Sequence, residues 1–183
     1  ITVQFKKTIQ GYADSILGCT LLQVFDNRVF FSGNKDHPNV VWHCSLNDPS
    51  YCSDLDYYQE GLDTAQINGI VAGNNALWVF REPSSANTTV FYHTPALDDE
   101  YGKVYPSTHS SVTTGCIGKA INFNDDIVFF SDRGMEGISG DITQHTFQLS
   151  GDGNPGADIG GIIAGIFYGD NFMDKIGVCL DLY

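Results

Sequence analysis

The chain has little positive charge. Its 183 residues include nine Lys and Arg against 22 Asp and Glu, which gives a formal net charge of −13 at pH 7. Nucleic-acid binding depends on clustered basic side chains that contact phosphates, and nine scattered cations do not form such a cluster. The composition therefore argues against nucleic-acid binding on the outer surface. An acidic surface instead favours solubility and keeps passing nucleic acid from sticking.

Long hydrophobic runs are missing as well. The most apolar stretch, residues 159–167, is interrupted by glycine and is too short to cross a bilayer as a helix. The chain shows no signal-peptide pattern. We therefore expect no membrane contact. Because the chain begins with Ile1 rather than Met, we also expect it to be a piece of a longer protein.

Cysteine is present, but without the spacing of a metal or redox site. The number of cysteines is odd, and no two of them stand as C-x-x-C. This pattern predicts free and mostly buried thiols in a reducing compartment; the alternative is a disulfide network. The cysteines are Cys19, Cys44, Cys52, Cys116 and Cys179.

Motifs of common enzyme classes are also absent from the sequence, which has no G-x-S-x-G, no P-loop and no H-E-x-x-H. Residues 151–156 match G-x-G-x-x-G, but a dinucleotide site needs a helix that starts in that turn, and the glycines at 160, 161 and 165 disfavour one. Asp152, Asn154 and Asp158 offer oxygen ligands in this loop, which makes calcium a weak metal candidate. We predict no catalytic residue, no enzyme activity and no cofactor.

What the sequence does contain is a recurring β-hairpin. Its clearest copy lies in residues 115–132, where 117–123 and 127–130 are predicted strands and Asn124, Asp125 and Asp126 form the predicted turn. Twenty glycines, 13% aromatic residues and 17% charged residues favour a turn-rich β protein. Similar hairpins are predicted at 21–31, 65–80 and 162–172, and a short helical turn is predicted at 14–17.

The hairpins recur at a nearly constant interval. Their last predicted turn residues, Asn27, Asn75, Asp126 and Asn171, are 48, 51 and 45 residues apart. A period in the forties is typical of β-propeller blades, which stack because one blade cannot bury both of its faces alone. We predict a single all-β domain, 1–183, made of antiparallel propeller-like blades with a period of about 48 residues. The alternative is a β-sandwich.

The predicted repeat units are 16–63, 64–114, 115–158 and 159–183, the last completed by residues 1–15. Third strands are predicted at 40–44, 88–93 and 142–149, and a further strand at 110–114. Residues 50–63 and 97–106 are predicted loops, and residues 133–137 a predicted turn.

Histidines and carboxylates occupy positions that suggest chemistry. His43, His93 and His145 stand at matching places in the predicted third strands. On separate blades such places lie far apart, so we predict structural histidines rather than a metal site. Carboxylates gather in two predicted loops beside tyrosines, at Asp54 and Asp56 and at residues 98–100. We predict solvated loop charges there; the alternative is a sugar-binding cleft.

Two segments resemble a known family. Residues 115–141, GCIGKAINFNDDIVFFSDRGMEGISGD, and 28–51, RVFFSGNKDHPNVVWHCSLNDPSY, are similar to propeller-like virion proteins of tailed bacteriophages and prophages, of the tail hub, nozzle or head–tail stabilisation type. The resemblance covers residues 11–183, and family members are longer than this chain. The most distinctive matches are Gly33-Asn34, Pro38-Asn39 and Asn47-Asp48-Pro49.

This resemblance implies a structural, non-catalytic role in the virion, with assembly in the bacterial cytoplasm. The implied partners are other virion proteins and further copies of the chain, arranged around a DNA channel. We expect the long loops of the β scaffold to make these contacts through aromatic side chains. The alternative function is a glycan-binding or glycan-cleaving propeller, in which carboxylates and aromatic rings converge at one mouth. The predicted contact residues are Tyr51, Tyr57, Tyr58, Tyr101 and Tyr105.

Overall fold

The computed structural model describes residues 13–53, 56–84, 89–98, 102–123, 126–131, 134–139 and 143–146. Within these ranges the chain forms one short helix and fourteen strands. The elements are α1 (Ala13–Leu17), β1 (Leu21–Phe25), β2 (Arg28–Ser32), β3 (Val40–His43), β4 (Tyr57–Gln59), β5 (Ile67–Gly73), β6 (Ala76–Arg81), β7 (Val90–His93), β8 (Ala96–Asp98), β9 (Gly102–Val104), β10 (Ser107–His109), β11 (Ala120–Phe123), β12 (Asp126–Ser131), β13 (Gly134–Ser139) and β14 (Thr143–Thr146). The prediction of an all-β chain is confirmed for the described part.

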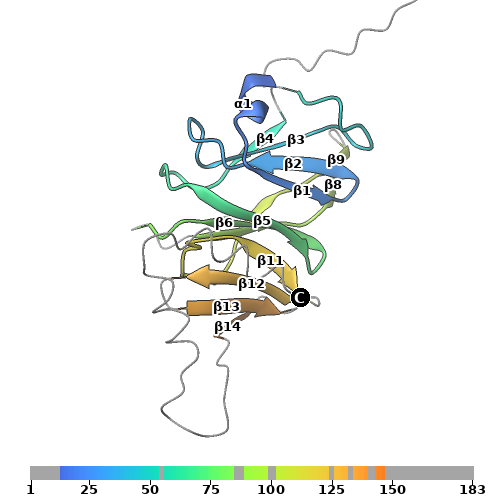
Figure 1. Cartoon of the computed structure of the whole chain (residues 1–183). Helices are drawn as coiled ribbons and strands as arrows, with labels where there is room; N and C mark the ends of the chain where they lie inside the picture. The colour runs from blue at the N-terminus through green and yellow to red at the C-terminus, as the bar shows by residue number, and fades with distance from the viewer. Residues whose placement is uncertain are drawn as a thin grey trace, which may run out of the picture.

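The strands form three antiparallel sheets of four strands each, stacked in chain order (Figure 1). The first sheet has the order β1-β2-β3-β4, the second β5-β6-β7-β10 and the third β11-β12-β13-β14; a separate hairpin, β8-β9, is inserted between β7 and β10. The first strand of the second sheet, β5, contacts both β1 and β11. The three sheets fall within the predicted units 16–63, 64–114 and 115–158, whereas residues 159–183 lie outside the described ranges.

Two-residue turns set the register of the first hairpins. Asp26 and Asn27 have φ values of 48° and 58°, and Asn74 and Asn75 have φ values of 51° and 58°. Asp and Asn tolerate this left-handed region, and turns with two such residues match the twist of paired strands. The first turn lies at Asp26 and Asn27 as predicted, whereas the second, predicted at residues 72–75, is confined to Asn74 and Asn75 because Gly73 still pairs with Ala76.

The third hairpin closes one residue earlier than predicted. Phe123 pairs with Asp126, so Asp126 is the first residue of β12 and not the last residue of the turn. A predicted turn of three residues would have shifted the register by one, which moves every side chain of the strand to the opposite face. The observed register buries Ile127 and Phe129 in the core.

Strand β6 lies at the centre of the core because its side chains alternate between two neighbouring sheets. Leu77 and Val79 join a cluster with Phe30 and Val41 of the first sheet. Trp78 and Phe80 join another cluster, with Ile127, Phe129 and Ile138 of the third sheet. All of β6 is buried, which explains why its sequence is a continuous apolar run rather than an alternating one.

Several predicted boundaries were wrong in the same way, because weak strands were assigned to loops. Residues 134–137 of the predicted turn belong to β13, and the predicted loops include β4, β9 and most of β8. The predicted strand 110–114 is not a strand, and β10 precedes it. His145 consequently lies in the fourth strand of its sheet, so it does not match His43 and His93, which both lie in third strands. The short helical turn at 14–17 is confirmed as α1.

Candidate functional site

A polar pocket lies between the first sheet and the β8-β9 hairpin. It has a volume of about 260 Å³ and combines charged, imidazole and tyrosine side chains. We call it the Arg28 pocket; its lining is Arg28, His43, Asp56, Tyr57, Tyr58, Lys103 and Val104.

Strand alternation brings the main side chains of the Arg28 pocket to one face of the first sheet. Arg28 and Phe30 are two residues apart on β2, Phe30 pairs with His43, and Val41 pairs with Tyr58. Side chains two apart on a strand, or directly paired across strands, share a face. Arg28, His43 and Tyr58 therefore project together toward the second sheet.

The Arg28 guanidinium is held in place by the protein, but not all of its hydrogen-bond donors have a partner among the described residues. One terminal nitrogen donates a hydrogen bond to the Cys44 carbonyl at 3.0 Å, and the guanidinium carbon lies 5.5 Å from the centre of the Tyr105 ring. The Nε atom is buried and has no hydrogen-bond partner among the described residues. A buried donor without a partner is costly, so Arg28 is held here at some expense of stability.

His43 is a neutral acceptor in this setting. Burial lowers its pKa below the ordinary value of 6.5, against the opposing effect of its contact with the Cys44 carbonyl. Its Nδ1 lies 3.1 Å from that carbonyl oxygen and 3.4 Å from a terminal nitrogen of Arg28; the contact with the carbonyl is the shorter, so we assign the ring proton to Nδ1. Nε2 then carries a free lone pair.

The two third-strand histidines lie close together, which corrects the prediction that they are far apart. The Tyr58 ring packs between them, with its centre 5.4 Å from the His43 ring and 4.9 Å from the His93 ring. The prediction treated the sheets as separate blades, whereas β4 inserts a tyrosine into the space between two packed sheet faces. Among the described residues, no group of three or more His, Cys, Asp or Glu could hold a metal ion.

Asp26 ties the first hairpin turn to β9 and to Tyr105, which follows β9. Its carboxylate accepts hydrogen bonds from Lys103 Nζ at 2.6 Å and from the Tyr105 hydroxyl at 2.7 Å. These bonds, together with the charge of Lys103, hold the pKa of Asp26 below its ordinary value of 3.8. The positive charge of Lys103, at the edge of the Arg28 pocket, is thereby balanced by the carboxylate of Asp26.

The Asp26→Asn variant is expected to be less stable than wild type at pH 6 and to lose this difference in acid. A carboxyl whose pKa is lowered by folding stabilises the protein above its ordinary pKa, and this contribution disappears as pH falls through the lowered pKa. Urea unfolding at pH 6 and at steps below pH 3.8 measures the difference. A difference that does not change with pH would show that the ionised form of Asp26 is not the stabilising one.

A buried group at the border of the first two sheets superficially resembles a catalytic triad. The His93 Nε2 lies 2.7 Å from Glu60 Oε1 without the alignment of a hydrogen bond, and its Nδ1 lies 2.9 Å from the Tyr105 carbonyl oxygen. Ser107 donates to the other Glu60 oxygen at 2.7 Å. In a triad the imidazole contacts the hydroxyl that it activates, whereas here the serine contacts the carboxylate. The geometry fits a structural link.

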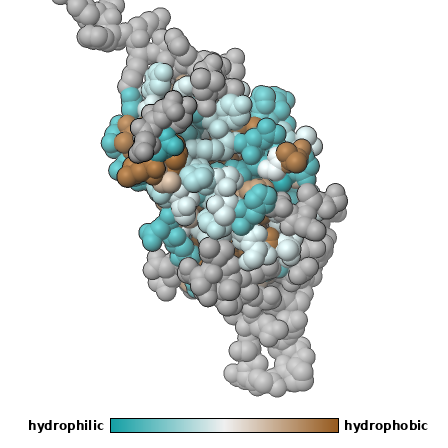
Figure 2. All heavy atoms as spheres, turned by 180° about the vertical axis from the view of Figure 1, so that it is seen from behind, coloured by the Kyte–Doolittle hydropathy of each residue, from teal (hydrophilic) through white to brown (hydrophobic). Residues whose placement is uncertain are grey.

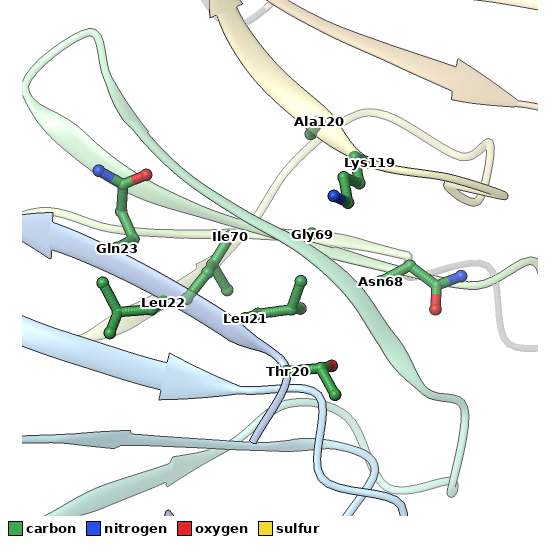
Figure 3. A pocket seen from close by; sticks show the side chains of 9 residues that line it. All are labelled: Thr20, Leu21, Leu22, Gln23, Asn68, Gly69, Ile70, Lys119 and Ala120. Atoms are coloured by element: carbon green, nitrogen blue, oxygen red, sulfur yellow. The ribbon is translucent and has the colours of Figure 1, made fainter. Parts of the chain in front are cut away.

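A second hollow, of about 250 Å³, lies where the first strands of the three sheets meet (Figure 3). Lys119 extends toward β5 from the start of β11, and Leu22 and Gln23 approach from β1. At Gly69 a side chain would lie only 3.1 Å from the Ala120 backbone nitrogen, so glycine permits this close approach of β5 and β11. The nine lining residues include no carboxylate or imidazole that could form an acid–base pair with Lys119.

The predicted contact tyrosines separate into exposed and buried members. Tyr51 and Tyr57 are 36% and 44% exposed, and Tyr58 is half-buried. Tyr105 is only 1% exposed, so its assignment to a surface contact was wrong. Its ring packs edge-on against Phe30 at 5.5 Å, and its hydroxyl is held by Asp26. Tyr101 and the calcium candidates Asp152, Asn154 and Asp158 lie outside the described residues.

The sequence prediction missed the two cations of the site. Arg28 follows a two-residue turn and shares a strand face with Phe30, so alternation alone indicated a charged side chain directed inward. Lys103 gave no such signal, because β9 was predicted as a loop. Asp56 was identified as a loop carboxylate near tyrosines, and the structure places it with Tyr57 and Tyr58 in the Arg28 pocket.

The thiols of the described cysteines are free, as predicted. Burial raises the pKa of Cys19 and Cys52 to about 11 and that of Cys116 to about 12. A thiol with a raised pKa holds little of the reactive thiolate at neutral pH. These three cysteines are therefore suited to packing rather than to nucleophilic or metal chemistry.

No helix in the described part of the chain combines the length and apolar character needed to span a membrane. No protein-family model matches this chain, and no curated protein matches its sequence.

Proposed function

We propose that the chain is a structural and interaction module of a tailed-phage or prophage virion, built from propeller-type blades and assembled near the DNA channel. The observation that carries this proposal is the repetition of one unit. Three consecutive four-stranded antiparallel sheets are stacked, and their first strands lie side by side. Radial repetition of such sheets is the principle of a propeller, in which neighbouring blades bury each other's faces.

Buried and partly buried polar links between successive units support a rigid scaffold role. Glu60, at the end of the first sheet, pairs with His93 of the second. Thr114 donates to Glu136 of β13 at 2.6 Å, and Arg81 of β6 pairs with Asp63, which follows the first sheet. Each link connects segments that are far apart in sequence, which restricts movement of one sheet relative to another.

The outer face of the first sheet supports a contact role. Leu22 and Val24 are 64% and 58% exposed, and by register they share this face with Phe31 and Val29. Between the described sheets, equivalent apolar faces are buried. We therefore assign the outer face to contact with an apolar sheet face of a neighbouring virion subunit. Among the described residues on the face shown in Figure 2, apolar surface forms separate patches between polar residues.

The double variant Leu22→Ser/Val24→Ser is expected to fold but to enter virions at least about tenfold less than wild type, because it removes two apolar anchors of a contact. Particles grown with the variant gene are purified, and the chain is quantified in them by mass spectrometry. The matched control is Leu97→Ser, which changes a leucine that is 88% exposed on β8. Normal incorporation of the double variant would contradict the contact assignment.

The virion assignment itself is tested by separating tails from heads. We expect the chain in the tail fraction in a fixed ratio to other tail proteins. The net charge of −13 supports this location, because an acidic surface near a channel repels passing DNA instead of binding it. Absence of the chain from purified particles would overturn the proposal.

A further inference from the structure

We propose that the outer face of the first sheet binds residues 159–169 of a second copy of this chain, so that copies associate head to tail. This assignment rests on the proposed function, which gives the face to a neighbouring virion subunit, and it names that subunit and its contact segment. Three features point to this contact: the composition of the face, the way in which the described sheets pack, and the sequence that follows the third sheet.

The outer face of the first sheet carries no charged side chain on its described strands. By strand register, the side chains on this face are Leu22, Val24, Val29, Phe31, Val40, Trp42, Tyr57 and Gln59. None of them is charged, although the whole chain has a net charge of −13. A partner that covers this face has to be apolar and uncharged as well, because a charge buried against apolar side chains is costly.

The open part of this face lies over β1 and β2. Leu22 and Val24 are 64% and 58% exposed, whereas Trp42 on β3 is only 1% exposed. The ring of His37, in the loop before β3, packs edge-on against Trp42 with 5.7 Å between the ring centres. The chain itself thus covers the face over β3, and the accessible apolar surface over β1 is the part that a partner reaches.

The contacts between the described sheets show what kind of partner fits such a face. Leu77 and Val79 of the second sheet pack against the first sheet. Trp78 and Phe80, on the opposite face of the same strand, pack against the third sheet. In both contacts an apolar sheet face meets another apolar sheet face, as is usual for stacked sheets. We therefore expect the partner to be a strand unit of the same type.

The sequence of this chain supplies one more predicted unit. Residues 147–183 follow β14, outside the described ranges, and contain the predicted hairpin 162–172. The most apolar stretch of the chain, residues 159–169, has the sequence IGGIIAGIFYG and contains no charged residue. This stretch therefore matches the outer face of the first sheet in both hydrophobicity and charge.

The order of the sheets favours a second copy over the same chain. The described sheets are stacked in chain order, and the second sheet lies between the first and the third (Figure 1). A fourth unit that continues this order packs on the third sheet, and its remaining face is then at the opposite end of the stack from the first sheet. Contact between two different surfaces is heterologous and joins copies into a ring or a filament.

The test uses two variants, each of which removes one side of the contact. Leu22→Asp places a charge on the outer face, and Ile162→Asp/Ile163→Asp places a charge on both sides of the predicted strand. Sedimentation velocity of the wild-type chain is expected to show association with a dissociation constant on the order of 10 μM. Each variant alone is expected to associate at least about tenfold more weakly, because the contact buries an unpaired charge.

A one-to-one mixture of the two variants is expected to form dimers that neither variant forms alone. In the mixture the intact segment of the Leu22→Asp copy binds the intact outer face of the other copy. Leu97→Asp, which adds the same charge at a leucine that is 88% exposed on β8, is the matched control and is expected to associate like wild type. Circular dichroism checks that each variant is folded.

A mixture of folded variants without dimers would overturn the proposal, as would a wild-type chain that stays monomeric at about 100 μM, tenfold above the expected constant. Association that is weakened by Leu22→Asp but not by Ile162→Asp/Ile163→Asp would also overturn it, because the contact would then join two identical outer faces. Virion incorporation is a separate measurement. A chain that enters virions without associating head to tail leaves the scaffold proposal standing, with a different subunit on the outer face.

Discussion

The Phe80→Ala variant is expected to lose about 3–5 kcal/mol of unfolding free energy. Phe80 is completely buried on β6, and its ring centre lies 4.9 Å from that of Phe129 on β12. Alanine removes this contact between the second and third sheets and leaves a cavity that the surrounding strands fill only in part. Since domains are stable by about 5–15 kcal/mol, we expect a measurable unfolded population without denaturant.

Urea unfolding followed by tryptophan fluorescence measures this loss, because Trp42 and Trp78 are both 1% exposed in the folded chain. Phe123→Ala, which removes the same ring from a site that is 59% exposed, is the matched control and is expected to change stability by about 0.5 kcal/mol or less. Phe80→Leu is expected to recover most of the loss, since it restores buried volume. Equal effects at Phe80 and Phe123 would show that the two sheets do not depend on this contact.

Local chemistry explains the parts of the fold that were predictable from sequence. The turns at Asp26-Asn27 and Asn74-Asn75 were recognisable because these residue types accept a positive φ. The strands beside them were recognisable from branched and aromatic runs such as β6. Both signals are contained within a few residues, so no information about the rest of the fold was needed.

Strands that depend on distant partners were missed. Residues of β13 were predicted as a turn because glycines at 134 and 137 flank a charged residue, Glu136. In the structure β13 is held by β12 and β14 on its two sides. Glu136 is fully buried, where it accepts hydrogen bonds from Ser131 at 2.8 Å and from Thr114 at 2.6 Å. A sequence window does not contain the partners that make such a residue acceptable in a strand.

The residues of the Arg28 pocket could be predicted only in part, for the same reason. Asp56 and its tyrosines could be identified as a cluster because they are neighbours in sequence. Their convergence with Arg28 and Lys103 could not, since it depends on how the β8-β9 hairpin packs against the first sheet. Tyr105 was assigned to the surface for the same reason: a tyrosine in a polar segment looks exposed until the packing of the next sheet is known.

Removal of the Glu60 carboxylate is expected to lower the unfolding free energy by about 3–5 kcal/mol, the usual cost of breaking a buried ion pair by deleting one partner. Glu60 and His93 are both completely buried, with 2.7 Å between Oε1 and Nε2. The second ring nitrogen of His93 faces the Tyr105 carbonyl. Both ring nitrogens of His93 therefore face oxygen atoms. Urea unfolding of Glu60→Ala against wild type measures the loss.

A double-mutant cycle separates the ion pair from simple loss of packing. If the imidazole left behind is the main cost, Glu60→Ala/His93→Phe will be more stable than Glu60→Ala alone, because the second change removes the orphaned polar ring. Glu60→Gln retains the size of the side chain and an oxygen for Ser107, so it isolates the charge. Asp36→Ala removes an exposed carboxylate and is expected to change stability by about 0.5 kcal/mol or less. Additive effects of the Glu60 and His93 changes would show that the Glu60–His93 contact does not stabilise the protein. The Arg81–Asp63 pair would then be the main polar contact between the first two sheets.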